Sequence, residues 1–163
     1  MYPPKLLQLA ERVLTACHNN GLKLALAESC TGGLVAGALS AVPGSSQVLD
    51  RGFVTYANEA KTELLGVAAE LLAAHGAVSE PVARAMAEGA IRSPEIDISV
   101  SVTGIAGPGG GGAQKPVGLV HIASARKNAP TLHRRHVFNG DRESIRLQAV
   151  AAALELLLER SQP

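Results

Sequence analysis

Aromatic side chains are scarce in this 163-residue chain, which contains two Tyr, two Phe and no Trp. Proteins that bind single-stranded nucleic acid stack its bases on aromatic rings, and nucleic-acid binding in general needs a strongly basic surface. With few aromatic rings and a net charge of +1, the chain has neither feature. We therefore expect no nucleic-acid partner.

Long apolar runs are also missing, although hydrophobic residues make up 47% of the chain. A membrane-spanning helix needs about 18 or more consecutive apolar residues, and no segment provides them. Glu11 and Arg12 interrupt the first apolar stretch, so the N-terminal residues do not resemble a signal peptide. We expect a cytoplasmic protein whose core is built from Ala, Leu, Val and Ile.

The residues that most often bind metals are few and dispersed. The two cysteines, Cys17 and Cys30, lie in no CxxC pair, which argues against a disulfide framework or a cysteine-rich metal site. The five histidines form no HExxH motif, and residues 133–136 (HRRH) are expected to form a solvated strand face. We therefore expect neither a metal site nor a cofactor.

The chain contains a regular alternation of helical and strand patterns. Helices are predicted over residues 3–19, 31–41, 58–66, 68–76, 79–92 and 142–160, and strands over 22–27, 48–57, 96–104, 117–125 and 131–138. Asn58 and Asp141 are the expected N-caps of two of these helices. The last two strands have a short link and are expected to pair antiparallel. The pattern predicts an α/β fold: one three-layer α/β/α domain over residues 1–163, with a mixed central sheet.

Residues 27–33 (AESCTGG) join a predicted strand to a predicted helix and hold three hydroxyl or thiol groups in a row. At such a junction, backbone N–H groups and the helix dipole can bind a phosphate or stabilise the oxyanion formed when Ser29 or Cys30 attacks a substrate. The junction lacks the GKS/T ending of a P-loop and the GxGxxG pattern of dinucleotide folds. An ordinary helix start, capped by Ser29 or Thr31, is the simpler alternative.

A nucleophilic serine needs a base, and Lys61 is the strongest candidate. It lies near the start of a predicted helix, just after the strand that ends near Tyr56. A lysine that is removed from water can lose its proton near neutral pH, and Ser–Lys pairs are an established variant of the nucleophile–base arrangement. The alternative is a solvated surface lysine, which is what most lysines are.

Several segments together resemble the CinA C-terminal domain family. They are AESCTGG (27–33), TYANEAK (55–61), LLGV (64–67), GAVSE (76–80), TGIAGPGG (103–110), KPVG (115–118) and FNGDR (138–142), followed by Arg146. The resemblance covers roughly residues 5–160. The enzymatic members of this family are nicotinamide-nucleotide amidohydrolases. They hydrolyse the carboxamide of nicotinamide mononucleotide to nicotinate mononucleotide and ammonia.

The resemblance implies a metal-free Ser–Lys mechanism and a role for each matched residue. Ser29 would be the nucleophile and Lys61 the general base, and Tyr56 would orient or relay the proton. Thr103 would be a further polar group of the site, and the substrate would contact Gly104. The N–H groups of Cys30, Thr31 and Gly32 are the candidate oxyanion donors, with Gly33 completing the substrate-binding turn.

Arg142 and Arg146 are spaced to share one face of the last helix and are candidates for binding the substrate's phosphate. The alternatives are acidic neighbours on the same helix or an exposed helix face. The glycine-rich loop TGIAGPGGGG (103–112) is expected to cover the ribose or phosphate with backbone N–H groups.

The resemblance also implies a homodimer and a stand-alone version of a domain that follows a larger one in many relatives. Two other functions stay open at this point. In the first alternative, the protein hydrolyses a different small amide. In the second, it is a non-catalytic binding module associated with competence or DNA damage.

Overall fold

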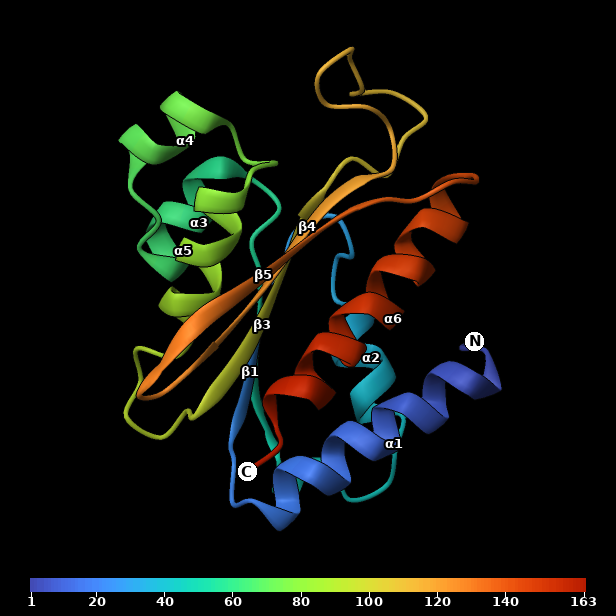
Figure 1. Ribbon diagram of the computed structural model, residues 1–163, viewed down its shortest axis with the longest axis vertical. Coiled ribbons are helices and arrows are strands. Elements are labelled where there is room, and N and C mark those ends of the chain that lie inside the picture. Colours follow the sequence, from blue (N-terminus) through green and yellow to red (C-terminus); the bar gives the residue numbers. More distant parts are fainter.

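Five strands form one mixed sheet in the order β2-β1-β3-β4-β5 (Figure 1). The computed structural model describes residues 1–163. Its strands are β1 (Leu24–Glu28), β2 (Leu49–Val54), β3 (Ile98–Gly104), β4 (Leu119–Arg126) and β5 (Ala129–Val137). β1 runs parallel to β2 and β3, whereas β4 is antiparallel to both β3 and β5. The prediction of an α/β fold with a mixed sheet is confirmed, as is the antiparallel pairing of the last two strands.

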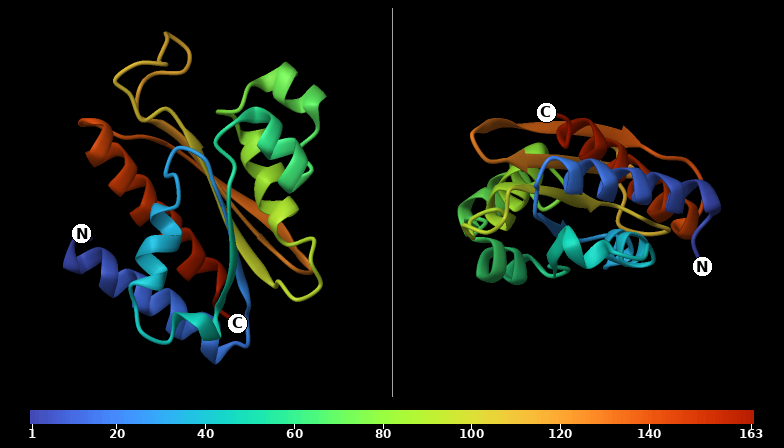
Figure 2. Two further views of the ribbon diagram at one scale, coloured as in Figure 1. Left: turned by 180° about the vertical axis from the view of Figure 1, so that it is seen from behind. Right: turned by 90° about the horizontal axis from the view of Figure 1, so that it is seen from below.

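Six α-helices and one short 3₁₀ helix connect and flank these strands. They are α1 (Pro4–Asn19), α2 (Leu34–Ser40), η1 (Ser45–Gln47), α3 (Asn58–Leu65), α4 (Ala69–His75), α5 (Glu80–Ala90) and α6 (Arg142–Arg160). Helices α1, α2 and α6 lie on one face of the sheet and α3, α4 and α5 on the other, which gives the expected three layers (Figures 1 and 2). None of the helices is both long and apolar enough to cross a bilayer.

The side chains of β1 alternate between two separate cores because successive residues of a strand face opposite sides of the sheet. Leu24 and Leu26 join the larger core, under α1, α2 and α6. Ala25 and Ala27 join the smaller core, under α3 to α5. All five residues of β1 are buried, as expected for an interior strand of a sheet that is covered on both faces.

Strand β3 binds α5 through hydroxyl groups on the same face. Ser99 and Ser101 donate hydrogen bonds to the carbonyls of α5, at Ala87 (2.6 Å) and Ala83 (2.6 Å). Thr103, the next residue on this face, donates to the carbonyl of Ala77 at 2.9 Å. This row of buried hydroxyls fixes α5, and the segment before it, against the end of β3.

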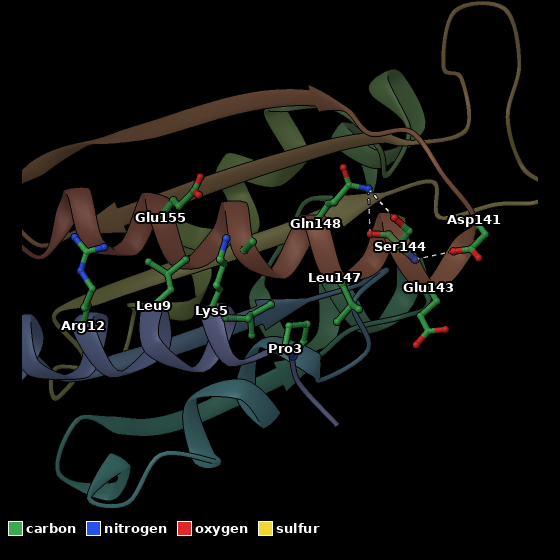
Figure 3. A pocket seen from close by; sticks show the side chains of 12 residues that line it. Pro3, Lys5, Leu9, Arg12, Asp141, Glu143, Ser144, Leu147, Gln148 and Glu155 are labelled. Atoms are coloured by element: carbon green, nitrogen blue, oxygen red, sulfur yellow. Dashed lines mark hydrogen bonds between the residues drawn. The ribbon is translucent and has the colours of Figure 1, made fainter.

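Helix starts were predicted with mixed success. Asp141 caps α6 as predicted, its carboxylate accepting the Ser144 N–H at 2.8 Å (Figure 3). The prediction that Asn58 caps α3 is wrong, because Ala57 is the N-cap residue and Asn58 is the first residue of the helix. No side chain caps this helix, which leaves the Asn58 side chain free to line the neighbouring cavity.

Candidate active site

The carboxyl ends of three parallel strands lie at the same end of the sheet, and several candidate residues come directly after these strands in the sequence. β1 ends at Glu28, β2 at Val54 and β3 at Gly104. In α/β sheets, ligands bind at the carboxyl ends of parallel strands, where loops and helix starts converge. A cavity of about 280 Å³ lies at this end, and its lining includes residues that follow all three strands.

Ser29 and Lys61 meet inside this cavity. The Lys61 Nζ lies 3.0 Å from the Ser29 Oγ, although the residues are 32 positions apart in the sequence. Ser29 is the first residue after β1, and its N–H is bound to the Val102 carbonyl of β3 at 2.9 Å. Lys61 is the fourth residue of α3, which follows the edge strand β2. The serine backbone is therefore fixed by the centre of the sheet, and the lysine approaches from the next strand connection.

Lys61 is buried, with 1% of its surface exposed, and forms no ion pair. Its Nζ donates to the carbonyls of Thr55 at 2.8 Å and Tyr56 at 3.5 Å. Burial lowers the pKa of this amine because the charged form loses its hydration. In the neutral form, two N–H groups can face the two carbonyls, and the nitrogen lone pair is then free to accept the Ser29 proton. The contacts suit a general base.

The turn after Ser29 differs from the expectation of a helix start capped by a hydroxyl. The N-cap of α2 is Gly33, and neither Ser29 nor Thr31 caps the helix. Instead the buried Glu28 carboxylate accepts three N–H groups, from Gly33 (3.1 Å), Val35 (3.1 Å) and Ala36 (2.9 Å). These amides are therefore occupied by the protein's own carboxylate and are not available to a substrate.

The free N–H groups of the turn lie closer to the nucleophile. The Gly32 N–H is bound to the Ser29 carbonyl at 3.0 Å, whereas the N–H groups of Cys30 and Thr31 donate to no other residue. Of these two residues, Cys30 lines the cavity and Thr31 does not. The side chain of Thr31 is fully buried, and its hydroxyl oxygen has no hydrogen-bond partner.

Cys30 lies next to Ser29 but is a poor nucleophile in this environment. Only 6% of the residue is exposed. Burial raises the pKa of its thiol to about 11, so the reactive thiolate is rare at neutral pH. The side chain belongs to the larger hydrophobic core.

Tyr56, Thr103 and Gly104 also line the cavity, but their contacts differ. The Thr103 hydroxyl holds the Ala77 carbonyl, so it fixes the wall formed by Ala77 and Val78. Tyr56 contacts Lys61 through its backbone carbonyl, whereas its exposed phenol accepts a hydrogen bond from Arg142 at 3.0 Å.

Arg142 and Arg146 occupy different positions around the site. Arg142 lines the cavity and bridges two of its walls, donating to Tyr56 Oη and to the Gly107 carbonyl at 2.8 Å. Arg146 lies outside that lining and donates to the carbonyls of Cys30 (3.0 Å) and Thr31 (3.0 Å). Both arginines line a separate hollow of about 450 Å³ beside Tyr2 and the start of α6.

The structure therefore brings together seven of the predicted site residues and leaves four outside the cavity. Those that line it are Ser29, Cys30, Tyr56, Lys61, Thr103, Gly104 and Arg142. Those outside it are Thr31, Gly32, Gly33 and Arg146. Glu28 was not predicted as a site residue. The feature that could have indicated it is a single carboxylate at the end of an otherwise apolar strand, LALAE.

A larger cavity, of about 660 Å³, lies away from this site between α1 and α6 (Figure 3). Leu9 and Leu147 are among its apolar lining residues, and Lys5 and Arg12 on α1 and Glu155 on α6 also line it. Its lining contains neither Ser29 nor Lys61.

Comparison with known proteins places the chain among relatives of similar length and among longer ones. It is 48% identical over 160 residues to nicotinamide-nucleotide amidohydrolase PncC of Escherichia coli (strain K12), covering 98% of this chain and 97% of the relative. It is 55% identical over 150 residues to a CinA-like protein of Anaeromyxobacter sp. (strain K), covering 92% of this chain. The match spans only 36% of that longer relative.

The fold comparison agrees with the sequence comparison. The crystal structure of competence/damage inducible protein CihA from Agrobacterium tumefaciens superposes with a TM-score of 0.96 at 49% identity, and the match covers 99% of each chain. A CinA superfamily protein from Escherichia coli superposes with a TM-score of 0.91 at 35% identity, covering 98% of this chain and 94% of the other. Residues 6–161 match the family profile of the CinA C-terminal domain, and the chain belongs to that family.

Proposed function

We propose that this chain hydrolyses the carboxamide of a nicotinamide nucleotide, with nicotinamide mononucleotide as the substrate and Ser29 and Lys61 as the reacting pair. The observation that carries the proposal is the 3.0 Å contact between the buried Lys61 Nζ and the Ser29 Oγ. The relative named nicotinamide-nucleotide amidohydrolase, which matches nearly end to end, supports the choice of substrate.

The first half of the reaction forms an acyl-enzyme. Neutral Lys61 takes the proton of Ser29 as its oxygen attacks the carboxamide carbon, and the carbonyl oxygen becomes an oxyanion. The Cys30 N–H, with that of Thr31 beside it, supplies free donors near this oxygen. Lys61 then delivers the proton to the nitrogen, the C–N bond breaks, and ammonia leaves.

The second half releases the acid. Lys61 takes a proton from water, the resulting hydroxide attacks the ester carbon, and the bond to Ser29 Oγ breaks. The serine oxygen recovers its proton from Lys61. The carboxylic acid that forms gives its own proton to water and leaves as a carboxylate. No step in this scheme requires a metal ion.

The remaining cavity residues would hold the rest of the nucleotide. Arg142 has donors beyond those bound to Tyr56 and Gly107, and it is the side chain of the lining best suited to a phosphate. The loop residues Gly109 and Gly110 also line the cavity and carry N–H groups that no other residue accepts. A volume of about 280 Å³ is near the lower end of the range for ligand pockets, about 300–1,000 Å³, and suits a small substrate.

The test uses purified, chelator-treated protein and nicotinamide mononucleotide, with ammonia and nicotinate mononucleotide measured together. We expect turnover in the wild-type chain and its loss in Ser29→Ala and Lys61→Ala. An active Ser29→Ala variant beside an inactive Cys30→Ala variant would overturn the assignment of the nucleophile. Folded but inactive wild-type protein would direct attention to a panel of other amides, with and without a phosphate, or to a binding role.

The other expectations stay predictions. We propose one structural domain over residues 1–163, a homodimer in solution and a cytoplasmic location, with no nucleic-acid or membrane partner. Size-exclusion chromatography coupled to light scattering tests the dimer directly.

A further inference from the structure

Two charged side chains bind the turn that follows Ser29, and the proposed reaction uses neither. Glu28 lies on β1, before the turn, and binds the first amides of α2 after it. Arg146 comes from α6, more than 100 positions along the chain, and binds carbonyls inside the turn. Glu28 therefore links the two ends of the turn, and Arg146 binds its middle.

The contacts of Arg146 determine which way the peptide groups of the turn face. Its Nε and Nη2 donate to the Cys30 and Thr31 carbonyls, each at 3.0 Å. In a planar trans peptide the C=O and N–H bonds point in opposite directions. The Thr31 N–H therefore points away from the guanidinium, and so does the Gly32 N–H, which reaches the Ser29 carbonyl.

The backbone of the turn approaches Arg146 closely at Gly32. Gly32 and Gly33 have φ values of 58° and 102°, in the left-handed region that favours glycine. A Cβ on Gly32 would lie 3.3 Å from the Arg146 Nη2, so the guanidinium lies close to the backbone at this residue. The side chain is therefore part of the support of the turn.

We propose that Arg146 is a positioning residue. By holding the Thr31–Gly32 peptide, whose N–H binds the Ser29 carbonyl, it sets the Ser29–Cys30 peptide so that the Cys30 N–H, on the cavity lining, meets the oxyanion. This inference rests on the proposed function, and it assigns Arg146 a role different from phosphate binding. Arg142, which lines the cavity, is the arginine that would contact the substrate. The two arginines should therefore affect different kinetic constants.

The kinetic test compares Arg146→Gln and Arg146→Lys with wild-type protein on nicotinamide mononucleotide and on its phosphate-free riboside. Loss of one oxyanion donor costs about 10²–10³ in kcat, so displacement of donors that are still present should cost about 10- to 100-fold. We expect this loss in kcat on both substrates, with the KM for the nucleotide changed by less than about threefold. A raised KM for the nucleotide alone would overturn the proposal and make Arg146 a phosphate ligand.

Arg126→Gln is the matched control. Arg126 also donates to two backbone carbonyls, at Arg160 and Gln162, but it lies at the opposite edge of the sheet. We expect Arg126→Gln to keep the wild-type kcat, even if it lowers the melting temperature as much as Arg146→Gln does. Equal losses of kcat in the two variants would mean that Arg146 acts only through general stability, and the proposal would fail.

Chemical rescue and covalent labelling separate this inference from the choice of substrate. Guanidinium ions at millimolar concentration should restore part of the kcat of Arg146→Ala and have no effect on wild-type protein. A fluorophosphonate probe reacts with Ser29 by forming an O–P bond and releasing fluoride, while Lys61 takes the serine proton. Because the phosphoryl oxygen needs the same N–H donors, Arg146→Gln should be labelled at least tenfold more slowly, as measured by intact mass.

Labelling distinguishes the two possible failures. Wild-type protein that is labelled but does not deamidate the nucleotide would refute the proposed substrate and leave the role of Arg146 testable by labelling rates. Equal labelling rates in wild-type and Arg146→Gln protein would overturn the role of Arg146, whatever the natural amide is.

Discussion

Lys61 reaches the hydroxyl of Ser29 at 3.0 Å with no acidic group bound to it. Its polar contacts apart from the serine are the carbonyls of Thr55 and Tyr56, which stabilise a charged amine less than a carboxylate would. Burial lowers the pKa of Lys61 because the charged form loses its hydration, so the folded chain disfavours protonation of this amine.

Replacing this lysine should therefore stabilise the protein while abolishing its activity. Lys61→Met keeps the length and apolar stem, and we expect a gain of about 1–2 kcal/mol in the free energy of unfolding at pH 7. In the wild-type chain the folded state binds fewer protons than the unfolded state between the lowered pKa and the ordinary value of 10.5. The free energy of unfolding of the wild-type chain should therefore rise with pH between these two pKa values. The difference in stability between Lys61→Met and wild-type protein should become smaller over the same range.

Urea denaturation of both proteins from pH 7 to 10 measures the difference. Glu11→Gln, a change on an exposed position of α1, serves as the control and should follow wild-type protein. A constant difference between Lys61→Met and wild-type protein across this range would mean that the pKa of Lys61 is not lowered.

The Cys30 thiol should be dispensable, because the site uses the backbone N–H of this residue and its pKa of about 11 keeps the thiol protonated. We expect Cys30→Ala to keep kcat within about threefold of wild-type and to lose about 1–2 kcal/mol of stability from a small cavity. Iodoacetamide should not inactivate wild-type protein at pH 7. Rapid inactivation that the Cys30→Ala change prevents would contradict this prediction.

Glu28→Gln should destabilise the chain and slow the reaction. The glutamine replaces one carboxylate oxygen by an NH₂ group, which faces an amide of α2 and leaves a buried donor unsatisfied. Such a loss costs about 1–3 kcal/mol, and a chain of this size should melt at least about 3 °C lower. Differential scanning calorimetry and kcat measured on the same samples test both effects. An unchanged melting temperature would show that the carboxylate charge is not needed at the start of α2.

Acid should destabilise the protein through a pair of histidines on the sheet. The His121 Nδ1 lies 2.8 Å from the His133 Nε2, and burial, followed by the charge of His133, lowers the pKa of His121 to about 4. Arg135 and Lys115 act in the same direction, and Glu80 opposes them. Between pH 6.5 and about 4 the unfolded chain binds a proton at this histidine that the folded chain excludes. The free energy of unfolding should therefore decrease as the pH is lowered through this range, by at most about 3 kcal/mol.

The variant His121→Asn removes this titration. Its free energy of unfolding should fall less than that of wild-type protein between pH 6.5 and 4 in urea denaturation experiments. Parallel pH dependences in the two proteins would sink the prediction.

The sequence was most informative where local chemistry decides structure. The cap at Asp141 predicted the start of α6, and the short link between β4 and β5 predicted their antiparallel pairing. The expectation that residues 133–136 form a solvated face was wrong for His133, because its side chain stacks on His121 and is only 10% exposed. That contact depends on the register of two strands, which the local pattern does not fix.

The site was harder to predict because its supporting contacts cross long stretches of sequence. Glu28 binds amides five to eight positions away, beyond the spacing of a local N-cap, and it appeared only as the residue that ends a strand. Arg146 binds the turn from 115 and 116 positions away, so its spacing from Arg142 suggested a shared anion instead. No local pattern links Ser29 with Lys61. The need of a serine nucleophile for a base made Lys61 a candidate, and the family resemblance then assigned the pair.

The edge strand gives the site a further property. β2 pairs with β1 alone, and four of its six residues, Asp50, Arg51, Gly52 and Val54, are exposed. Lys61 lies on the helix that follows β2, whereas Ser29 directly follows the interior strand β1. Local opening of an edge element costs less than global unfolding. Mild denaturant should therefore move Lys61 away from Ser29 while the inner strands stay paired. Catalytic activity should then be lost at a lower denaturant concentration than the spectroscopic signals of global unfolding.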